Sequence, residues 1–576
     1  MRLRTPLMVL LLCLAPHAGA QQVDWRPLSA DLFEQASSRQ RFVFLYLEAV
    51  WCHWCHVMQR ETLANPEVAT ALGRRWIATR VDHDANPLLA NRYRDYGWPA
   101  LIFFAPDGTE LVKRAGYLAP QAFLDLLAAI EADPTPEAAG ALRGGAQQTQ
   151  AQALSAAERA LLEEKFRATD DPRRAGLRTP QKFLDRDTVE YALLHEPAIA
   201  VRTLDAAQRL LDPVWGGVYQ YSTGSDWNRP HYEKLMRTQA GYLRIYARAH
   251  AQLGRAADLN VAQRIRDYML DFLQAPNGAF HPSQDADLVR GSKADDYFAL
   301  DDAKRRRRGM PRVDPALYAD ASGLAAEALA TLYEVSGDEQ ALTAARQAAQ
   351  WLISQRRLPD GRYRHGERDR EGRYLGDTLH AARAFLQLYR VTAERHWLAQ
   401  AQASADALAR HFRAADAGLL TATGAIGPLQ PLPVVEENIY AARLLNLLAH
   451  YGGRAADREL ALHALRFLVQ PALVRDAYTE PGILLADAEL ASDPAHFTIV
   501  GPRHDAQAAA LHAVALRAPG SYKRVEWWDR AEGPLPHADI EYPRLARPAA
   551  YVCAAGRCSL PSFTPEAYAQ AIARLR

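Results

Sequence analysis

The chain has 576 residues, of which 49% are hydrophobic and 23% are charged, and its formal net charge is +1. A chain of this length is expected to form two or more domains with ample cores. The balanced charge gives no basis for electrostatic attraction to a nucleic acid, so we expect no nucleic-acid partner. We interpret the one basic run, residues 305–308, as a solvated loop.

The first twenty residues have the features of a secretory signal peptide. Two arginines precede an apolar run from Leu7 to Leu14, and residues 18–20 read Ala-Gly-Ala, a small-x-small cleavage site. We therefore expect residues 1–20 to be removed, with an uncleaved membrane anchor as the alternative. No later stretch is long and apolar enough to cross a bilayer, so no stable membrane span is expected after cleavage. These features favour a bacterial periplasmic or secreted protein.

Residues 21–132 are expected to alternate strands and helices. The continuous apolar run Phe42 to Leu47 is typical of a strand that is buried on both faces. Asn65-Pro66 and Asn86-Pro87 have the N-cap and first-turn residues of helices. The resulting order, βαβαββα, predicts an α/β domain of thioredoxin type. Residues 133–150, rich in Pro, Gly and Gln, are then a linker.

Residues 151–517 are expected to be mainly helical. Short Gly-containing turns follow helices at intervals of close to sixty residues, which suits one helical hairpin per repeat. Six such hairpins can close into an all-α (α/α)6 toroid. An irregular helical array is the alternative. Residues 518–576 remain as a C-terminal segment with a second cysteine pair.

The strongest functional motif is Cys52-His53-Trp54-Cys55, which directly follows the buried strand and begins a helix. Amide groups at a helix N-terminus favour negative charge, so Cys52 is expected to be the attacking thiolate. Cys55, one turn further on, can then resolve the mixed disulfide. His53 and His56, when protonated, would favour the thiolate further and make the pair more oxidising. We therefore expect Cys52, Cys55, His53 and His56 to be catalytic.

Two other interpretations of this motif are open. Cys52 to His56 also has the C-x-x-C-H form of a c-type haem attachment site, and its cysteines and histidines are zinc ligands by type. Haem sites usually lie in small helical domains, and four ligands so close in sequence cannot easily surround zinc tetrahedrally. A redox pair with no metal and no cofactor is therefore preferred.

Trp98-Pro99 lies 47 residues after Cys52, just before the next expected strand. Thioredoxin-like folds have a cis-proline at this point, beside the dithiol, where backbone groups can pair with an extended substrate. We therefore include Pro99 among the catalytic residues and Trp98 among the substrate-binding ones. An ordinary trans proline at the start of a strand is the alternative.

The second cysteine pair, Cys553 and Cys558, is a candidate disulfide because its short spacing closes a small loop. A structural staple is the favoured role. The alternative is a relay in which this pair exchanges with Cys52 and Cys55.

Several further motifs, taken in order, resemble one family. The segment Cys52 to Met58 looks like the signature of the spermatogenesis-associated thioredoxin-domain family. Its members join a thioredoxin-like domain to a domain resembling N-acylglucosamine 2-epimerases and other six-hairpin sugar enzymes. The remaining matching segments are Tyr96–Pro99, Pro230–Lys234, Asp285–Asp287, Tyr374–Asp377, Glu437–Asn438, Tyr551–Cys553 and Cys558–Pro561.

The expected toroid carries acids and histidines at or near helix starts, where sugar-active enzymes have their funnel. Epimerisation needs an acid and a base on opposite faces of a carbon, and glycoside hydrolysis needs two carboxylates. Each residue taken singly could equally be a helix cap or an ion-pair partner. The candidate substrate-binding residues are His231, Glu233, Asp285, Asp287, Asp377, Glu437 and Asn438.

Three classes of function follow. The first is an exported thiol–disulfide oxidoreductase whose toroid binds a protein client, a redox partner or a carbohydrate. The second is a sugar-active enzyme, epimerase-like or glycosidase-like, with an accessory thioredoxin domain. The third is a binding module in which both domains are scaffolds.

Overall fold

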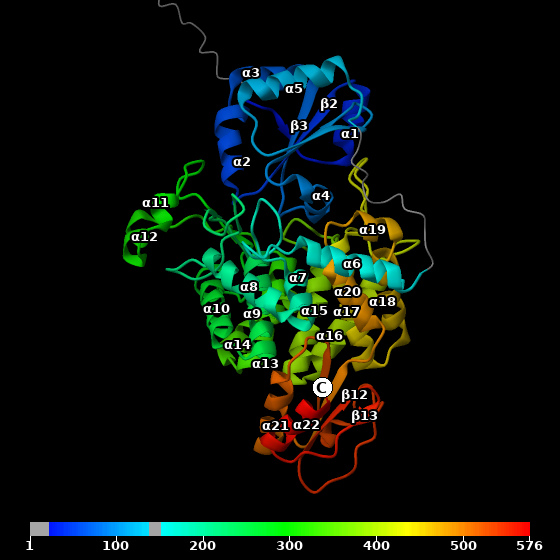
Figure 1. Cartoon of the computed structure of the whole chain (residues 1–576). Helices are drawn as coiled ribbons and strands as arrows, with labels where there is room; N and C mark the ends of the chain where they lie inside the picture. The colour runs from blue at the N-terminus through cyan, green and yellow to red at the C-terminus, as the bar shows by residue number, and fades with distance from the viewer. Residues whose placement is uncertain (1–21, 138–150, 576) are drawn as a thin grey trace, which may run out of the picture.

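The computed structural model describes residues 22–137 and 151–575, so the expected signal peptide and residues 138–150 of the expected linker lie outside the described residues. Three bodies follow one another along the molecule (Figure 1). A thioredoxin-like domain lies at one end, a helical toroid in the middle, and a smaller α/β unit at the other end. Across the described ranges, no helix combines the length and apolarity that a membrane span requires.

The first domain is built on a five-stranded sheet. Its strand order is β1 (Trp25–Arg26), β3 (Trp76–Asp82), β2 (Phe42–Glu48), β4 (Ala100–Phe104) and β5 (Glu110–Ala115). Strands β1, β3 and β2 are parallel, whereas β4 and β5 are antiparallel to their neighbours. This arrangement confirms the thioredoxin-like fold.

Both faces of this sheet are covered, which explains why β2 is buried along its whole length. Because successive side chains of a strand point to opposite faces, alternate residues of β2 enter two separate apolar cores. One core includes α3 (Pro66–Arg75) and α5 (Pro120–Ala132), and the other includes α1 (Ala30–Ser38) and α4 (Pro87–Arg92). Asn65 and Asn86 cap α3 and α4, as the Asn-Pro pairs predict.

The helical part forms a closed double ring in the described residues. Neighbouring inner helices pack in a circle, and the last returns to the first. The inner helices are α7 (Arg186–His195), α9 (Met236–Leu253), α13 (Ala319–Ser336), α15 (Leu375–Thr392), α17 (Val435–Gly452) and α20 (Pro481–Leu490). The outer helices are α8 (Pro197–Ala207), α10 (Ala256–Tyr268), α14 (Glu339–Trp351), α16 (Arg395–His411), α18 (Ala455–Leu468) and α6 (Ala156–Thr169). This is the (α/α)6 toroid.

Burial explains which helices form the inner ring. Every residue of α15 from Leu375 to Val391 is buried, because the helix contacts neighbours on all sides. The paired outer helix α16 is amphipathic and buries one face only. Gly254 and Gly337 follow the last residues of α9 and α13 and adopt the left-handed conformation, which glycine reaches without strain. The backbone therefore turns sharply after each of these two helices, at the same end of the ring.

The basic run 305–308 is helical rather than the loop that we expected, and although Arg306, Arg307 and Arg308 are exposed to solvent, Arg305 is not. The run lies in a short helix, α12 (Asp302–Arg308), and the side chain of Arg305 is fully buried. The guanidinium of Arg305 donates to Asp212 at 2.8 Å, and Lys234 donates to the same carboxylate at 2.7 Å. A single buried anion therefore pairs with two cations and fixes this segment to the toroid.

The C-terminal unit contains a four-stranded sheet in the order β11 (Lys523–Trp528), β10 (Ala495–Val500), β12 (Ala549–Ala554) and β13 (Arg557–Cys558). Helices α21 (Ala506–Arg517) and α22 (Pro565–Leu575) pack on it. Strand β10 pairs with both β11 and β12, so this unit begins near residue 495, whereas the sequence placed its start at 518.

Candidate functional site

The cysteine motif lies where the first domain meets the toroid. Cys52 is the N-cap of α2 (His53–Met58), and its Sγ accepts a hydrogen bond from the Cys55 amide at 3.1 Å. Cys52 and Cys55 are joined in a disulfide. Sulfurs bonded to each other cannot both ligate zinc or attach haem, so the structure has the form that the redox interpretation predicts. On reduction, the amides of the first turn stabilise the Cys52 thiolate.

The disulfide is covered. Cys52 is 3% exposed and Cys55 is not exposed at all. Trp51 and Trp98 of the thioredoxin-like domain pack around the cysteines, and Leu235 of the toroid completes the same apolar cluster. The peptide bond between Trp98 and Pro99 is cis, as predicted. The sulfurs therefore lie inside an interface rather than on an open surface.

Asp287 of the toroid accepts hydrogen bonds from both histidines of the motif. His53 Nδ1 lies 2.7 Å from Asp287 Oδ1, and His56 Nδ1 lies 3.1 Å from Asp287 Oδ2. The other ring nitrogen of His56 contacts the carbonyl oxygen of Val50 at 3.0 Å. We expected both histidines to act on the Cys52 thiolate, but these contacts direct them to the toroid, because the domains dock through this carboxylate.

The charges of this cluster are mutually adjusted. Burial opposes protonation of His56, but its hydrogen bond to Asp287 and the nearby charge of Asp285 raise its pKa above 6.5. Burial by itself would raise the pKa of Asp287, but the hydrogen bonds from His53 and His56 outweigh it and lower this pKa below 3.8. Burial raises the pKa of Asp285 to about 6. A protonated His56 and an ionised Asp287 therefore form a buried ion pair between the domains.

A second polar contact lies on the other side of the disulfide. The indole Nε1 of Trp51 donates to Asp84 Oδ2 at 2.8 Å, and His365 of the toroid contacts the Asp84 carbonyl oxygen at 2.7 Å. His365 Nδ1 also lies 2.9 Å from Asp377. Burial, with the charges of neighbouring acids, raises the pKa of Asp82 to about 8. Trp51 is thus held by a chain of contacts that ends on the toroid.

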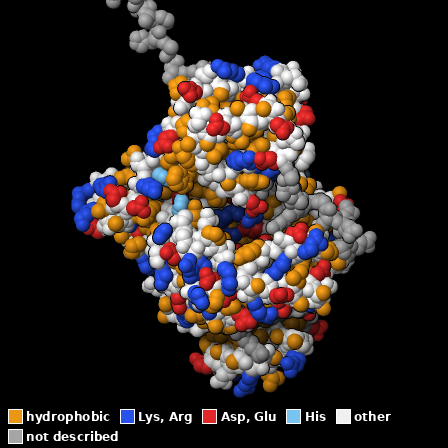
Figure 2. Space-filling model, turned by 45° about the horizontal axis from the view of Figure 1, so that its top comes forward, with side chains coloured by type: hydrophobic (Ala, Val, Ile, Leu, Met, Phe, Trp, Pro, Cys, Tyr) orange, Lys and Arg blue, Asp and Glu red, His pale blue; other side chains and the backbone are white. Residues whose placement is uncertain are grey.

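Helix α4 of the thioredoxin-like domain covers the toroid rim beyond the cysteines. Asn91 donates to Thr421 at 2.7 Å and to Glu437 at 3.2 Å. Burial raises the pKa of Glu437 to about 7. Arg94 lies 3.4 Å from Glu436. Because the inner helices begin at this rim, the first domain lies over the funnel in which a sugar site was expected. Figure 2 shows a hollow containing charged side chains between the two bodies.

Two of the remaining predicted residues, His231 and Glu233, lie together at the rim. Glu233 is buried and lies 3.7 Å from His231, whose ring stacks on Tyr221. The charge of Glu233 also acts on the nearby Asp285 carboxylate.

Asn438 has a structural role. Its amide side chain bonds the backbone of Leu419 in both directions, at 2.7 and 3.1 Å, and is fully buried. It fixes a loop, and because it is fully buried it is out of reach of a substrate.

Two groups of residues have the chemistry and spacing of metal ligands. They are His56 with Asp285 and Asp287, and His365 with Asp320 and Asp377. In both groups the histidine Nδ1 is hydrogen-bonded to one of the carboxylates, so an ion could enter only by breaking that bond.

Cys553 and Cys558 form the second disulfide, across the antiparallel pair β12 and β13. The C-terminal unit and the thioredoxin-like domain lie at opposite ends of the toroid (Figure 1). This placement favours the staple over a direct relay with Cys52.

Several contributors to the site were not among the predicted residues, and Asp84, Leu235 and His365 are examples. Leu235 follows the matched segment Pro230–Lys234 and forms the N-cap of α9. Asp84 lies in a turn after β3, and His365 in a loop before α15. No local pattern reveals them, because each acts only across the domain interface.

Fold and site together define a class of protein: a thioredoxin-like domain with a buried Cys-x-x-Cys disulfide, docked on the rim of an (α/α)6 toroid. Residues 13–133 match the Thioredox_DsbH family model, described as "Protein of unknown function, DUF255". Uncharacterized protein B0495.5 of Caenorhabditis elegans is 25% identical over 315 residues, which cover 48% of this chain and 43% of that protein. Spermatogenesis-associated protein 20 of Rattus norvegicus is 24% identical over 308 residues, covering 46% and 39%.

These matches confirm the resemblance read from the cysteine signature, and the alignments span less than half the length of both relatives. A shorter match joins the chain to Thiol:disulfide interchange protein DsbD of Colwellia psychrerythraea, 30% identical over 104 residues, 17% of each chain. Among solved structures, a D-mannose isomerase and the cellobiose 2-epimerase of Bacillus thermoamylovorans each match 54% of this chain. They cover 85% and 86% of their own chains, with 14% and 11% identity and TM-scores of 0.42 and 0.43.

Proposed function

We propose that this protein is a thiol–disulfide oxidoreductase that acts through Cys52 and Cys55. The observation that supports this proposal most is the disulfide at the N-terminus of α2, beside the cis Trp98-Pro99 bond. This combination provides an ionisable thiol, a resolving thiol and a backbone site for an extended substrate.

The exchange proceeds in two balanced steps. The Cys52 thiolate attacks a substrate disulfide, forming a mixed disulfide and releasing one substrate thiolate. The Cys55 thiolate then attacks Cys52 Sγ, which closes the Cys52–Cys55 disulfide and releases the second substrate thiolate. Two electrons pass from the protein to the substrate. The reverse sequence transfers a disulfide to a dithiol substrate.

The toroid restricts which substrates reach the sulfur. With Cys52 only 3% exposed, the surface of a folded protein cannot contact Sγ while the domains are docked. A substrate must enter as a narrow or extended segment, or after the interface opens at His53, His56 and Asp287. Trp54, between the two cysteines, is 38% exposed and offers an aromatic surface beside this entry. We propose that the toroid selects a client in this way.

We also propose that the protein is exported. Its N-terminal twenty residues have the signal-peptide pattern, and its four cysteines beyond this segment form two disulfides, which persist in oxidising compartments. Cell fractionation with N-terminal sequencing of the mature protein tests this point. A chain that retains residues 1–20 in the cytosol contradicts it.

A trapping experiment tests the oxidoreductase proposal. The Cys55→Ser variant keeps the attacking thiol but cannot resolve, so it should accumulate mixed disulfides with substrates that contain disulfides, such as oxidised insulin or scrambled RNase. Cys52→Ser should abolish exchange. The matched control, Cys553→Ser with Cys558→Ser, should keep the exchange rate of the wild type. Equal rates for Cys52→Ser and wild type would refute the proposal.

The second candidate is a sugar-active enzyme, and one observation favours it. Glu437 at the rim has a pKa of about 7 because it is buried, a value suited to a general acid. A panel of mannose, glucose, cellobiose and N-acylglucosamine, followed by NMR for epimerised or hydrolysed product, tests this candidate. Turnover that Glu437→Gln abolishes and Cys52→Ser preserves would establish it in place of thiol chemistry.

A further inference from the structure

The centre of the toroid holds two small adjoining cavities. Arg248 and Ser521 line both. Residues 518–523 of the C-terminal unit contribute to the walls, and the half-exposed side chain of Leu194 lies at the outer edge. These cavities lie toward the end of the ring that faces the C-terminal unit. The cavities are therefore separate from the cysteine site and from the rim residues.

Charged side chains from every inner helix line these cavities. The cations outnumber the carboxylates by six to four, which leaves two positive charges without a counterion among the lining residues. The cations are Arg244, Arg248, Arg383, Arg390, Arg443 and Lys523, and the carboxylates are Glu190, Glu327, Glu334 and Glu489.

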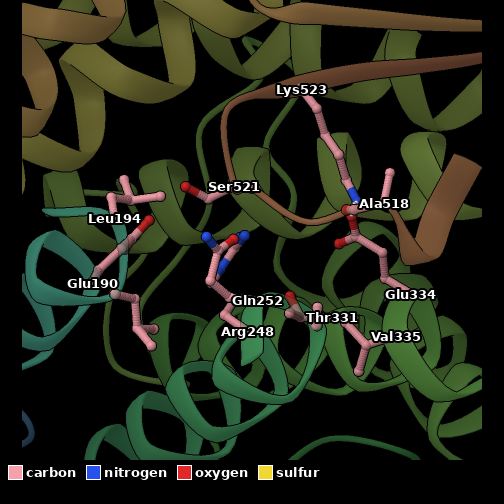
Figure 3. A pocket seen from close by; sticks show the side chains of 13 residues that line it. Glu190, Leu194, Arg248, Gln252, Thr331, Glu334, Val335, Ala518, Ser521 and Lys523 are labelled. Carbon is pink, nitrogen blue, oxygen red and sulfur yellow. Dashed lines mark hydrogen bonds and ion pairs between the residues drawn. The ribbon is translucent and has the colours of Figure 1, made fainter. Parts of the chain in front are cut away.

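The carboxylates are already engaged by other cations. Arg443 contacts Glu190 and Glu489, each at 2.7 Å. Lys523 contacts Glu334 at 2.9 Å (Figure 3). Burial by itself would raise the pKa of Glu334, but the positive charges of Lys523 and Arg390 lower it to about 2. This carboxylate therefore stays ionised.

Arg248 takes part in none of these ion pairs. In the part of the chain that the structure describes, no hydrogen bond or ion pair satisfies it, and its buried Nε has no partner. Its side chain points into the cavity between Glu190, Ser521 and Glu334 (Figure 3). Arg248 is only partly buried, so its terminal nitrogens remain open to the cavity while its buried Nε has no acceptor, and an anion in the cavity would supply one.

We propose that this lumen binds a small ligand through a dianionic phosphate group, held by Arg248. A phosphate monoester carries between one and a half and two negative charges at neutral pH and has three strong acceptor oxygens. Its charge matches the excess of two cations, whereas a single carboxylate would leave one cation unpaired. Guanidinium groups bind phosphate oxygens through paired hydrogen bonds.

Calorimetric titration of the full chain tests this proposal. Inorganic phosphate, glycerol 3-phosphate and succinate are titrated separately at constant ionic strength, set with chloride. We expect saturable binding of inorganic phosphate or glycerol 3-phosphate and weaker binding of succinate. A preference between the two phosphates then distinguishes a phosphate ester from free phosphate as the ligand.

Three variants make the test specific. Arg248→Gln should weaken phosphate binding at least tenfold, since a charge-assisted hydrogen bond is lost. Its melting temperature without ligand should not fall, because an unpaired cation has been removed. Glu489→Gln should tighten phosphate binding, because it raises the net positive charge of the cavity lining by one. Arg443 still has its ion pair with Glu190 in this variant. Arg307→Gln, an exposed arginine in α12, is the control and should bind like the wild type.

Absence of saturable phosphate binding would overturn the proposal and would mean that backbone carbonyls at the helix C-termini offset the cation excess. Tighter binding of succinate than of either phosphate would also overturn it. The same holds if Arg248→Gln binds phosphate as tightly as the wild type.

Discussion

Asp287 of the toroid lies 2.7 Å from His53 and accepts a hydrogen bond from a residue inside the Cys-x-x-Cys motif of another domain. The same carboxylate accepts from His56. One toroid side chain therefore holds both histidines beside the disulfide. The contact that docks the domains and the redox motif therefore share these residues.

The first prediction concerns Asp287→Asn and pH. The raised pKa of His56 contributes stability that is complete below pH 6.5 and is lost as pH rises through its folded-state value. The lowered pKa of Asp287 contributes stability above pH 3.8 that is lost as pH falls. The difference in the free energy of unfolding between wild type and variant should thus be largest between pH 3.8 and pH 6.5. We expect about 3 kcal/mol at pH 6, as for removal of one partner of a buried pair.

Urea unfolding at several pH values measures this difference, and the exposed Asp271→Asn serves as the control. NMR titration should also show a lower pKa for His56 in the Asp287→Asn variant. A pH-independent difference between wild type and variant would contradict the ion pair.

The second prediction concerns access to Cys52. Leu235→Ala removes an apolar contact over the cysteine cluster, so bulky reagents should reach the reduced thiol faster. In the wild type, a polymer-linked maleimide should react at least tenfold more slowly than iodoacetamide, relative to their rates with free cysteine, and Leu235→Ala should reduce this gap. Leu545→Ala, at a half-exposed position in the C-terminal unit, should leave it unchanged. Equal relative rates in the wild type would show that the interface is open.

The third prediction tests the docking surface on the other side of the sheet. Gly427 has a φ of 56°, and a Cβ there would lie 2.6 Å from the ring of Phe33. Gly427→Ala should therefore clash and strain the backbone, destabilising the docked state by about 1 to 3 kcal/mol. Nearby Gly424 has free space around it, so Gly424→Ala is the matched control. Protease cleavage between the domains, faster in Gly427→Ala only, is the readout.

The fourth prediction concerns the second disulfide. Cys553 and Cys558 close a short loop across two strands, so Cys553→Ser with Cys558→Ser should cost about 2 kcal/mol by the chain-entropy account. Because this unit lies at the far end of the toroid, the redox equilibrium of Cys52 and Cys55 should not change (Figure 1). A shift in the redox equilibrium of Cys52 and Cys55 in this variant would instead support the relay.

Local patterns in the sequence predicted the thioredoxin-like domain well. The apolar run at Phe42 and the Asn-Pro caps depend only on neighbouring residues, and the structure has them as expected. Asp285 and Asp287 were recognised as a motif and interpreted as substrate ligands. Their contact with His53 and His56 depends on how two domains dock, and spacing along the chain contains no information about that.

The lumen is a different case, because a signal was present. Arg383 and Arg390 are seven residues apart in the buried helix α15, and Glu327 and Glu334 repeat this spacing in α13. Seven residues are close to two helical turns, so each pair lies on one face. Such a polar stripe within a buried helix predicts a charged channel. The start of the C-terminal unit was missed because β10 is short and directly follows a helix.

A glutathione redox titration of the full chain, read by mass spectrometry after alkylation, tests the central claim most directly. We predict one reversible two-electron transition in which Cys52 and Cys55 gain alkyl groups together, at the same midpoint in the variant that lacks Cys553 and Cys558. If Cys52 and Cys55 stay unmodified or fully alkylated at every glutathione ratio, or carry haem or zinc, the pair is not a redox couple.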